Sequence, residues 1–267
     1  VPEGLPLMIS LVLMQNTSKM LDHNVLVRKA EGIETAGALN ILFSDKTGTI
    51  TKGEMEVVQF FSGDGTIIDT KQINNYPDIR EKLHVAIGKN TSSMFDEHHR
   101  VISGNATDQA LMKFLGEDSY LKMKEDPSLE VFASQKFNSS NKFSQAQIGG
   151  LTYYKGAPER LLQKADRYMG TDGQLHPLDL SCIDQRIDTL AKKAMRVIAF
   201  GYSEEPLQEN CISGNLILIG LAAIRDDVRP EARIAIHDVQ KAGIQVVMIT
   251  GDRLETASAI AKDAGLV

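Results

Sequence analysis

The sequence lacks several features that define other classes of protein. It has two cysteines, Cys182 and Cys211, without CxxC spacing, so we expect free thiols in a reducing compartment and no disulfide or zinc framework. No long basic run is present and the formal net charge is −6, which argues against a nucleic-acid partner. With 267 residues, of which 42% are hydrophobic and 24% charged, the chain is expected to fold into one large domain or two ordinary ones.

Long hydrophobic runs are also missing. The apolar run near the N-terminus, Leu5 to Met14, is ten residues long and is interrupted by a proline and a serine. A membrane-spanning helix needs about 20 apolar residues, and the run does not have the flanks of a signal peptide. Two interpretations stay open: a buried amphipathic helix, or the second half of a transmembrane helix. Lys19, Arg28 and Lys29 follow the run, as expected on a cytoplasmic flank.

Hydrophobic patterning divides the rest of the chain into short strands and helices. We expect a buried strand at 38–44 and a hairpin whose strands, 54–61 and 66–68, flank the turn sequence "SGDG". Pro158 is expected to open a helix that runs to about Met169. Further helices are predicted at 84–89, 107–115 and 180–195, and further strands at 129–136, 144–148 and 196–203.

The last part of the chain has a different pattern, in which strands alternate with helices. Strands at 215–224 and 244–249 are each followed by a predicted helix. This spacing is typical of a parallel, right-handed crossover unit. We therefore place strand 38–44 in the same parallel sheet as these two strands. The intervening residues are then an inserted domain of antiparallel strands and helices, so the fold class is α/β with an α+β insertion.

Two segments that end predicted strands carry polar groups suited to a phosphate. Ligands of an open parallel sheet bind beyond the carboxyl ends of its strands, where Asp45 and Thr250 fall. Lys46 follows Asp45, and Thr250, Gly251 and Asp252 precede a helix whose N–H groups suit an anion. Because like charges repel, a carboxylate beside a phosphate site needs a role. Asp45 is a magnesium ligand, a nucleophile, or an ordinary turn aspartate.

The heptapeptide "DKTGTIT", which begins at Asp45, resembles the phosphorylation motif of the P-type cation-transporting ATPases, where Leu commonly replaces Ile50. The resemblance implies that Asp45 accepts a phosphoryl group from ATP beside Lys46, and that Asp45 and Thr47 hold Mg²⁺. It also implies a partial haloacid-dehalogenase-like parallel sheet. Soluble phosphatases of the haloacid-dehalogenase type usually carry a second acid where this chain has Thr47, which speaks against that alternative.

Four segments in the middle of the chain resemble nucleotide-binding segments of the same family: "NATDQAL", "FNSSNK", "KGAPE" and "MRVIAF". This chain departs from the family pattern at Asp108, where Glu is usual, and at Asn141, where many members have Arg. Taken alone, each segment also has a structural interpretation, as a helix start, a core aromatic, a strand-to-helix turn or a surface arginine. The resemblance implies nucleotide contacts from Thr107, Asp108, Phe137, Lys142, Lys155, Gly156 and Arg196.

The segment "RDDVRPEA" resembles the family's hinge motif "DPxRPE". Asp226 and Arg229 match the motif and are included among the expected nucleotide-site residues, whereas Asp227 replaces the proline. The structural alternative is a helix N-terminus that is simply rich in charge.

Two further segments complete the resemblance. "MITGD" is similar to the family's second phosphate-site motif, with Thr250, Gly251 and Asp252 in register. "PEGLP" resembles the break in the fourth transmembrane helix of the type II pumps, which makes Glu3 a candidate ligand of the transported cation in the intact protein.

The resemblance implies a division into four segments: the end of transmembrane helix 4 and a stalk (1–22), the first part of the phosphorylation domain (23–57), the nucleotide-binding domain (58–213) and the second part of the phosphorylation domain (214–267). The implied function is ATP binding and aspartyl phosphorylation in an ATP-driven cation pump. Calcium pumps are the most similar, and Mg²⁺, H⁺ and Na⁺/K⁺ pumps are alternatives.

The implied partners are ATP, Mg²⁺, the transported cation and the actuator and membrane domains of the same chain. The intact protein would lie in a membrane, with this region on the cytoplasmic side. The family's downstream "GDGxND" motif and its actuator "TGES" motif do not occur in this sequence. We therefore expect weak nucleotide binding and little turnover from this piece alone. A nucleotide-binding module without turnover is the alternative description.

Overall fold

The structure is a computed structural model that describes residues 4–29, 31–193, 195–212, 214–251 and 254–267. The helices are α1 (Gly4–Asp22), α2 (Glu31–Gly37), α3 (Pro77–Gly88), α4 (Ala106–Leu115), α5 (Glu117–Glu125), α6 (Pro158–Leu161), α7 (Leu180–Lys192), α8 (Pro230–Lys241) and α9 (Leu254–Ala264). The strands are β1 (Ile41–Asp45), β2 (Thr51–Phe61), β3 (Ile67–Ile68), β4 (Met94–Phe95), β5 (Val101–Ile102), β6 (Val131–Asn138), β7 (Phe143–Ile148), β8 (Leu151–Gly156), β9 (Ala165–Met169), β10 (Leu175–Pro177), β11 (Arg196–Ser203), β12 (Leu216–Val228) and β13 (Gln245–Ile249).

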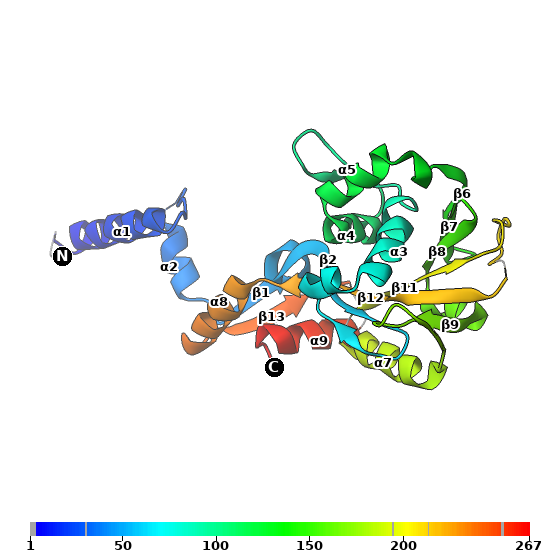
Figure 1. The fold of residues 1–267 in the computed structure, drawn as a ribbon. Helices are drawn as coiled ribbons and strands as arrows, with labels where there is room; N and C mark the ends of the chain where they lie inside the picture. The colour runs from blue at the N-terminus through cyan, green and yellow to red at the C-terminus, as the bar shows by residue number, and fades with distance from the viewer. Residues whose placement is uncertain (1–3, 30, 194, 213, 252–253) are drawn as a thin grey trace.

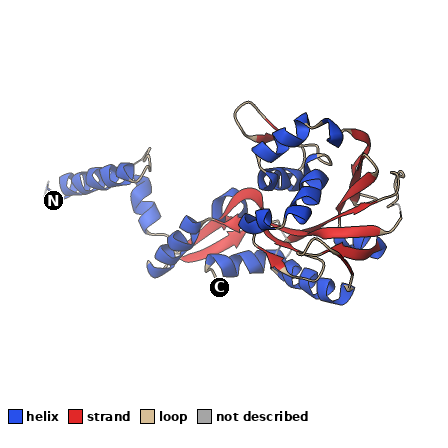
Figure 2. Ribbon diagram, in the orientation of Figure 1, coloured by secondary structure: helices blue, strands red, loops and turns tan. Residues whose placement is uncertain are grey.

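A large, mostly antiparallel sheet dominates the molecule (Figures 1 and 2). Among the described residues it has nine strands, in the order β10-β9-β12-β11-β8-β7-β6, with β2 and β3 attached beside β12. Helices α3, α4 and α5 pack on one face, and α6 and α7 pack on the other. Neighbouring side chains alternate between the two cores because successive strand residues point to opposite faces: Phe60 and Phe61 are both buried, one in each core.

Several expected elements are confirmed. The hairpin around "SGDG" forms, with Phe60 paired to Ile68 in antiparallel register. Helices α4 and α7 and strands β6, β7 and β11 cover the segments predicted for them, with boundaries that differ by a few residues. Helix α3 also forms, but it already begins at Pro77, well before the predicted start at His84. Strand β1 pairs in parallel with β13, as the proposed parallel sheet requires, with Ile41 opposite Gln245 and Asp45 opposite Ile249.

The crossover unit predicted for 215–224 and 244–249 is wrong. Strand β12 lies in the large sheet, antiparallel to β2 and β11, and not in the two-stranded sheet of β1 and β13. Its apolar run "LILIGLAAI" is buried along its whole length because helices cover both faces of the sheet. A continuous apolar run indicates a strand that is buried on both faces, and it does not specify whether the neighbouring strands are parallel.

The strand at 38–44 forms as β1 but is not buried as expected. Its three apolar residues, Ile41, Leu42 and Phe43, are exposed, and Phe43 keeps 62% of its surface. The described residues pair β1 with β13 alone, and the small core beside this sheet draws on β13, α8 and α9. Within the described part of the chain, the strand therefore has apolar surface that no layer covers.

The helix predicted from Pro158 to Met169 is also wrong. Helix α6 ends at Leu161, a short helical turn follows at Leu162–Lys164, and the chain then forms β9. Strand β9 pairs with β12 and β10, so sheet pairing overrides the helical pattern of this segment.

The N-terminal helix α1 buries none of the side chains in its 19 described residues, so of the two interpretations left open, the buried amphipathic helix is wrong. It extends away from the body of the molecule, joined through α2 (Figure 1). Within the described part of the chain, no helix combines the length and the hydropathy that a membrane span requires.

His84 makes the stability of the α3 face dependent on pH. Burial in α3, with a contribution from nearby Arg80, lowers the pKa of His84 from 6.5 to about 4. Between these two values the unfolded chain binds a proton that the folded chain does not, so we expect the free energy of unfolding to fall as the pH is lowered through this window, by roughly 2 kcal/mol. Urea denaturation between pH 7 and pH 4 would measure the loss.

His84→Gln should flatten this dependence because it removes the titrating ring. The matched control is His98→Gln, since His98 is exposed. An unchanged slope in His84→Gln would contradict the assignment.

Candidate nucleotide and phosphoryl site

Seven of the nine residues expected at the nucleotide site line one cavity of about 500 Å³, which we call cavity A. They come from the start of α4, the end of β6 and the turn after it, the end of β8 and the start of β11. Segments that are far apart in the sequence thus converge where these strands of the large sheet begin or end. The lining residues are Asn105, Thr107, Asp108, Phe137, Lys142, Lys155, Gly156, Ala157, Pro158, Glu159, Arg196, Val197 and Ile198.

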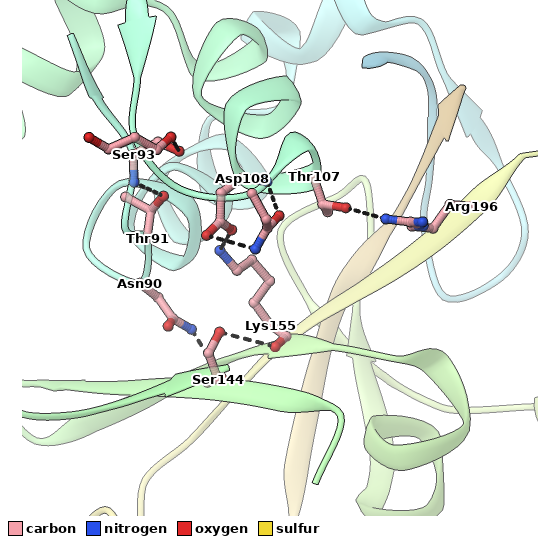
Figure 3. A network of polar contacts seen from close by, with 10 residues as sticks. Asn90, Thr91, Ser93, Thr107, Asp108, Ser144, Lys155 and Arg196 are labelled. Carbon is pink, nitrogen blue, oxygen red and sulfur yellow. Dashed lines mark hydrogen bonds and ion pairs between the residues drawn. The ribbon is translucent and has the colours of Figure 1, made fainter. Parts of the chain in front are cut away.

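A buried ion pair connects α4 to β8 at this cavity. The Lys155 ammonium lies 2.5 Å from Asp108 Oδ1, and the two side chains keep only 7% and 8% of their surface. Asp108 stands in the first turn of α4, where the Asn105 side chain caps the helix by accepting a hydrogen bond from the Asp108 backbone N–H at 2.9 Å. Figure 3 shows Lys155 reaching from its strand to this helix start.

Burial and the ion pair act on the pKa of Lys155 in opposite directions. Burial lowers the pKa of the Lys155 amine, and the charge and hydrogen bond of Asp108 oppose that shift. Removing the carboxylate would leave a buried cation without its partner charge. The Lys155 side chain therefore contributes to the wall of cavity A and to the attachment of α4, in addition to any contact with a ligand.

Gly156 occupies a position where neighbouring backbone atoms leave no room for a side chain. A Cβ atom at this position would lie 2.5 Å from the Lys142 carbonyl oxygen and 2.7 Å from the Phe143 Cα atom. Both are backbone atoms, which cannot move aside as a flexible side chain can. Glycine thus lets β8 approach the start of β7, and this close approach forms one wall of the cavity.

Phe137 and Arg196 occupy the accessible part of cavity A. Phe137 keeps 55% of its surface, so the interpretation of this residue as a core aromatic is wrong. The Arg196 Nη1 atom donates a hydrogen bond of 2.8 Å to Thr107 Oγ1, so this arginine is not a free surface residue (Figure 3). Lys142 forms an exposed ion pair of 3.0 Å with Glu159.

Asp45 and Thr250 lie at the carboxyl ends of neighbouring parallel strands. Asp45 pairs with Ile249 at the last register position of β1 and β13, and Thr250 follows directly. The described Asp45 side chain is exposed and makes no capping hydrogen bond to the turn at Lys46–Ile50. This geometry disfavours the turn-cap interpretation of Asp45. Gly48 in the turn has φ 75°, a conformation that side chains disfavour.

Asp226 and Arg229 contact the segment that follows Asp45, residues 46–53, which we call the Asp45 loop. They do not line cavity A. Asp226 Oδ2 accepts a hydrogen bond from Thr51 Oγ1 at 2.6 Å, and its Oδ1 accepts from the Gly53 N–H at 2.9 Å. Arg229 donates to the carbonyl oxygens of Thr51 and Gly48, at 3.0 and 3.2 Å. These two residues therefore hold the loop that follows Asp45.

A second cavity, of about 490 Å³, adjoins the Asp45 loop, and we call it cavity B. Lys46, Asp226 and Gly251 line it, together with residues of α7 and α9. Arg196 lines both cavity A and cavity B. This arginine thus stands between the nucleotide segments and the Asp45 loop.

The magnesium site expected at Asp45 and Thr47 stays a prediction. The described residues contain no group of three or more His, Cys, Asp or Glu side chains that could hold a metal ion. Two candidate residues, Asp252 and Glu3, lie outside the described residues.

Sequence reasoning missed some of the cavity. Asn105 precedes a helical pattern and has the residue type of an N-cap, so capping preference could have identified it. Val197 and Ile198 line the cavity from a strand, and no sequence signal marks them as different from core residues.

Comparisons with known proteins match these segments to one family. The family model "P-type ATPase, cytoplasmic domain N" matches residues 79–231. The chain is 32% identical to calcium-transporting ATPase 7, plasma membrane-type, of Oryza sativa over 288 residues, which cover all of this chain and 27% of that protein.

Two microbial proteins are similar to the same extent. Calcium-transporting ATPase 1 of Bacillus cereus is 32% identical over 281 residues and calcium-transporting ATPase 1 of Saccharomyces cerevisiae is 29% identical over 298 residues. Each alignment covers all of this chain and 31% of the relative. The chain therefore spans less than a third of the length of these three relatives.

The Lys155–Asp108 pair yields a prediction about stability. Lys155→Met or Asp108→Asn should each destabilise the chain by about 3 kcal/mol, because each leaves one buried group without its partner. The double variant should cost less than the sum of the two. Urea denaturation of the four proteins measures this coupling. The matched control is Lys142→Met, which breaks the exposed pair with Glu159 and should cost less than about 1 kcal/mol. Strictly additive losses would mean that the buried groups do not depend on one another.

Proposed function

We propose, since this chain belongs to the P-type ATPase family, that it binds ATP in cavity A and directs the γ-phosphate towards Asp45. One observation carries the proposal: seven residues from four separate motifs line the same cavity. The family resemblance stated from the sequence is confirmed by the match over residues 79–231.

The contents of cavity A suit a nucleoside with a charged tail. The exposed ring of Phe137 offers a stacking surface for a base. The buried pair of Asp108 and Lys155 supplies polar groups on the cavity wall. Arg196 and Lys142 are cations at the same cavity, and Arg196 also borders cavity B. The phosphates would lie along Arg196 and reach the Asp45 loop through cavity B.

In this proposal Asp45 is the nucleophile of a phosphoryl transfer. An Asp45 carboxylate oxygen forms a bond to the γ-phosphorus, the bond from that phosphorus to the bridging oxygen breaks, and ADP leaves with that electron pair. The Thr250 side chain and the backbone N–H groups of Gly251 and Asp252 would bind the phosphoryl oxygens, and Lys46 would contribute positive charge. Asp45 and Thr47 would supply oxygen ligands to Mg²⁺, which when bound neutralises phosphate charge.

The larger assignment rests on the resemblance of the sequence motifs. We propose that residues 23–57 and 214–267 belong to a phosphorylation domain with a partial haloacid-dehalogenase-like parallel sheet, and that 58–213 form the nucleotide-binding domain. Strand β2 crosses the first of these boundaries. Residues 1–22 would be the end of a membrane helix and its stalk, with Glu3 as a cation ligand.

The intact protein would be a membrane pump that couples ATP hydrolysis to cation transport, with this region on the cytoplasmic side. Calcium is the proposed ion because the relatives named above are calcium-transporting ATPases. By itself this chain would act as a nucleotide-binding module with little turnover.

The nucleotide site can be tested with a pair of aromatic variants on one strand. Phe137→Ala should weaken binding of a non-hydrolysable ATP analogue by about tenfold, the loss expected for one base–aromatic stack. Phe132→Ala is the matched control, because Phe132 is also an exposed phenylalanine on β6 but does not line cavity A. Isothermal titration calorimetry gives the dissociation constants.

The same titration with Arg196→Met tests the path of the phosphates. Binding of the triphosphate analogue should weaken, whereas binding of adenosine should stay close to that of the unmodified chain, because adenosine carries no phosphate for Arg196 to contact. Equal binding of the analogue to Phe137→Ala, Phe132→Ala and the unmodified chain would contradict cavity A as the nucleotide site.

A further inference from the structure

The end of strand β12 carries an ion-pair cluster centred on Arg225, which lines cavity B and to which the proposed function assigns no role. Arg225 Nη2 lies 2.5 Å from Asp227 Oδ1, and Arg225 Nη1 lies 2.8 Å from Asp263 Oδ2. Asp263 belongs to α9, so the guanidinium joins the last part of β12 to this helix. Asp227 is the residue that replaces the proline of the hinge pattern.

Two sides of β12 have different partners at this point. Asp226 binds the Asp45 loop through Thr51 and Gly53, whereas its two neighbours, Arg225 and Asp227, belong to the cluster with α9. The strand alternation explains this division, since successive side chains point to opposite sides. The β12–β2 register also shifts between Asp226 and Val228, which is the local irregularity of a bulge and re-aims the side chains there.

The remaining attachment of α9 is small. Ile260 and Ala264 are the buried residues that α9 contributes to a cluster with Ile50, Val228 and Ile236. Arg225 keeps 16% of its surface, and in the described part of the chain its buried Nε atom has no hydrogen-bond partner. A largely desolvated guanidinium interacts more strongly with a carboxylate than an exposed one does. The Arg225–Asp263 contact is therefore a substantial part of what fixes this helix.

We propose that Arg225 is a positioning residue that fixes α9, and with it the preceding Thr250–Gly251 turn, relative to the loop that carries Asp45. It acts through Asp263, and Asp227 orients the guanidinium. The relevance of this position to phosphoryl transfer rests on the proposed function of Asp45. The mechanical part of the inference depends only on the contacts of Arg225.

The replacement of proline by Asp227 gives the ionic contact with Arg225 a role in restricting the backbone at the hinge. Proline fixes its own φ and stiffens the chain, whereas an aspartate leaves the backbone free to rotate. Asp227 pairs with Arg225, and Arg225 in turn pairs with Asp263, so together the three residues join the hinge to α9. Unlike a proline, such a constraint weakens as salt concentration rises, because Asp227 and Asp263 keep 37% and 36% of their surface.

Hydrogen–deuterium exchange on the whole chain tests the inference. In Arg225→Met, amide exchange of α9 and of the turn before it should rise about tenfold, while exchange in α4 stays unchanged, because only the local opening becomes easier. Arg167→Met is the matched control, since Arg167 also lies on a strand of the large sheet and pairs with a carboxylate, Asp166. It should leave α9 unchanged.

A second variant separates positioning from a general loss of stability. Asp263→Asn should raise exchange in α9 like Arg225→Met, and the double variant should add little, because both changes remove one contact. Higher salt should raise α9 exchange in the unmodified chain and much less in the variants. If Arg225→Met fails to fold, Asp263→Asn carries the same test.

Unchanged exchange of α9 in Asp263→Asn would overturn the inference, and so would an equal rise across all helices. Protection of β6 and β8 by an ATP analogue, followed in the same experiment, reports on the proposed nucleotide site. The two proposals can therefore fail separately.

Discussion

The structure depends on the burial of one strand on both of its faces. Along most of its length β12 is apolar and enclosed, with helices on either side of the sheet. Its last residues change character abruptly, and Asp226 and Arg225 there bind the Asp45 loop and α9. The buried part of β12 cannot shift without disrupting two cores. The positions of the charged residues at its end are therefore fixed relative to the sheet. Both cavity A and the Asp45 loop are thus attached to the same sheet.

Cavity A shows how a polar site survives within a packed domain. The Lys155 ammonium and the Asp108 carboxylate would each be costly to bury alone, and their contact makes burial tolerable. The pair places a charged but internally neutralised surface behind the exposed ring of Phe137. With Asp108 in place of the usual Glu, the carboxylate still reaches Lys155 directly. Lys155 thus has a structural role that its motif alone does not reveal.

The motifs around Thr107, Phe137, Lys155 and Arg196 identified residues that line one cavity, because short motifs are recognised by their residue types. That these residues bind a nucleotide stays a prediction. The topology of the large sheet was not predicted. Topology depends on pairing between distant strands, which local patterns do not encode. Strand β12 looked like part of a parallel unit since burial on both faces leaves the same apolar run in either orientation. The segment after Pro158 has a helical pattern, yet pairing with β12 made it a strand.

Arg196 lines both cavity A and cavity B, and it therefore links the two parts of the proposed site. Its hydrogen bond to Thr107 holds the guanidinium at the start of α4, while its position between cavities A and B leaves it beside the route to Lys46. A long nucleotide can occupy both cavities only if their relative placement stays within the reach of its phosphates. That placement is set where β12 leaves the large sheet, since β2, α9 and the Asp45 loop all attach there. Under the proposed function, residues outside cavity A would therefore determine whether a nucleotide bound there can reach Asp45.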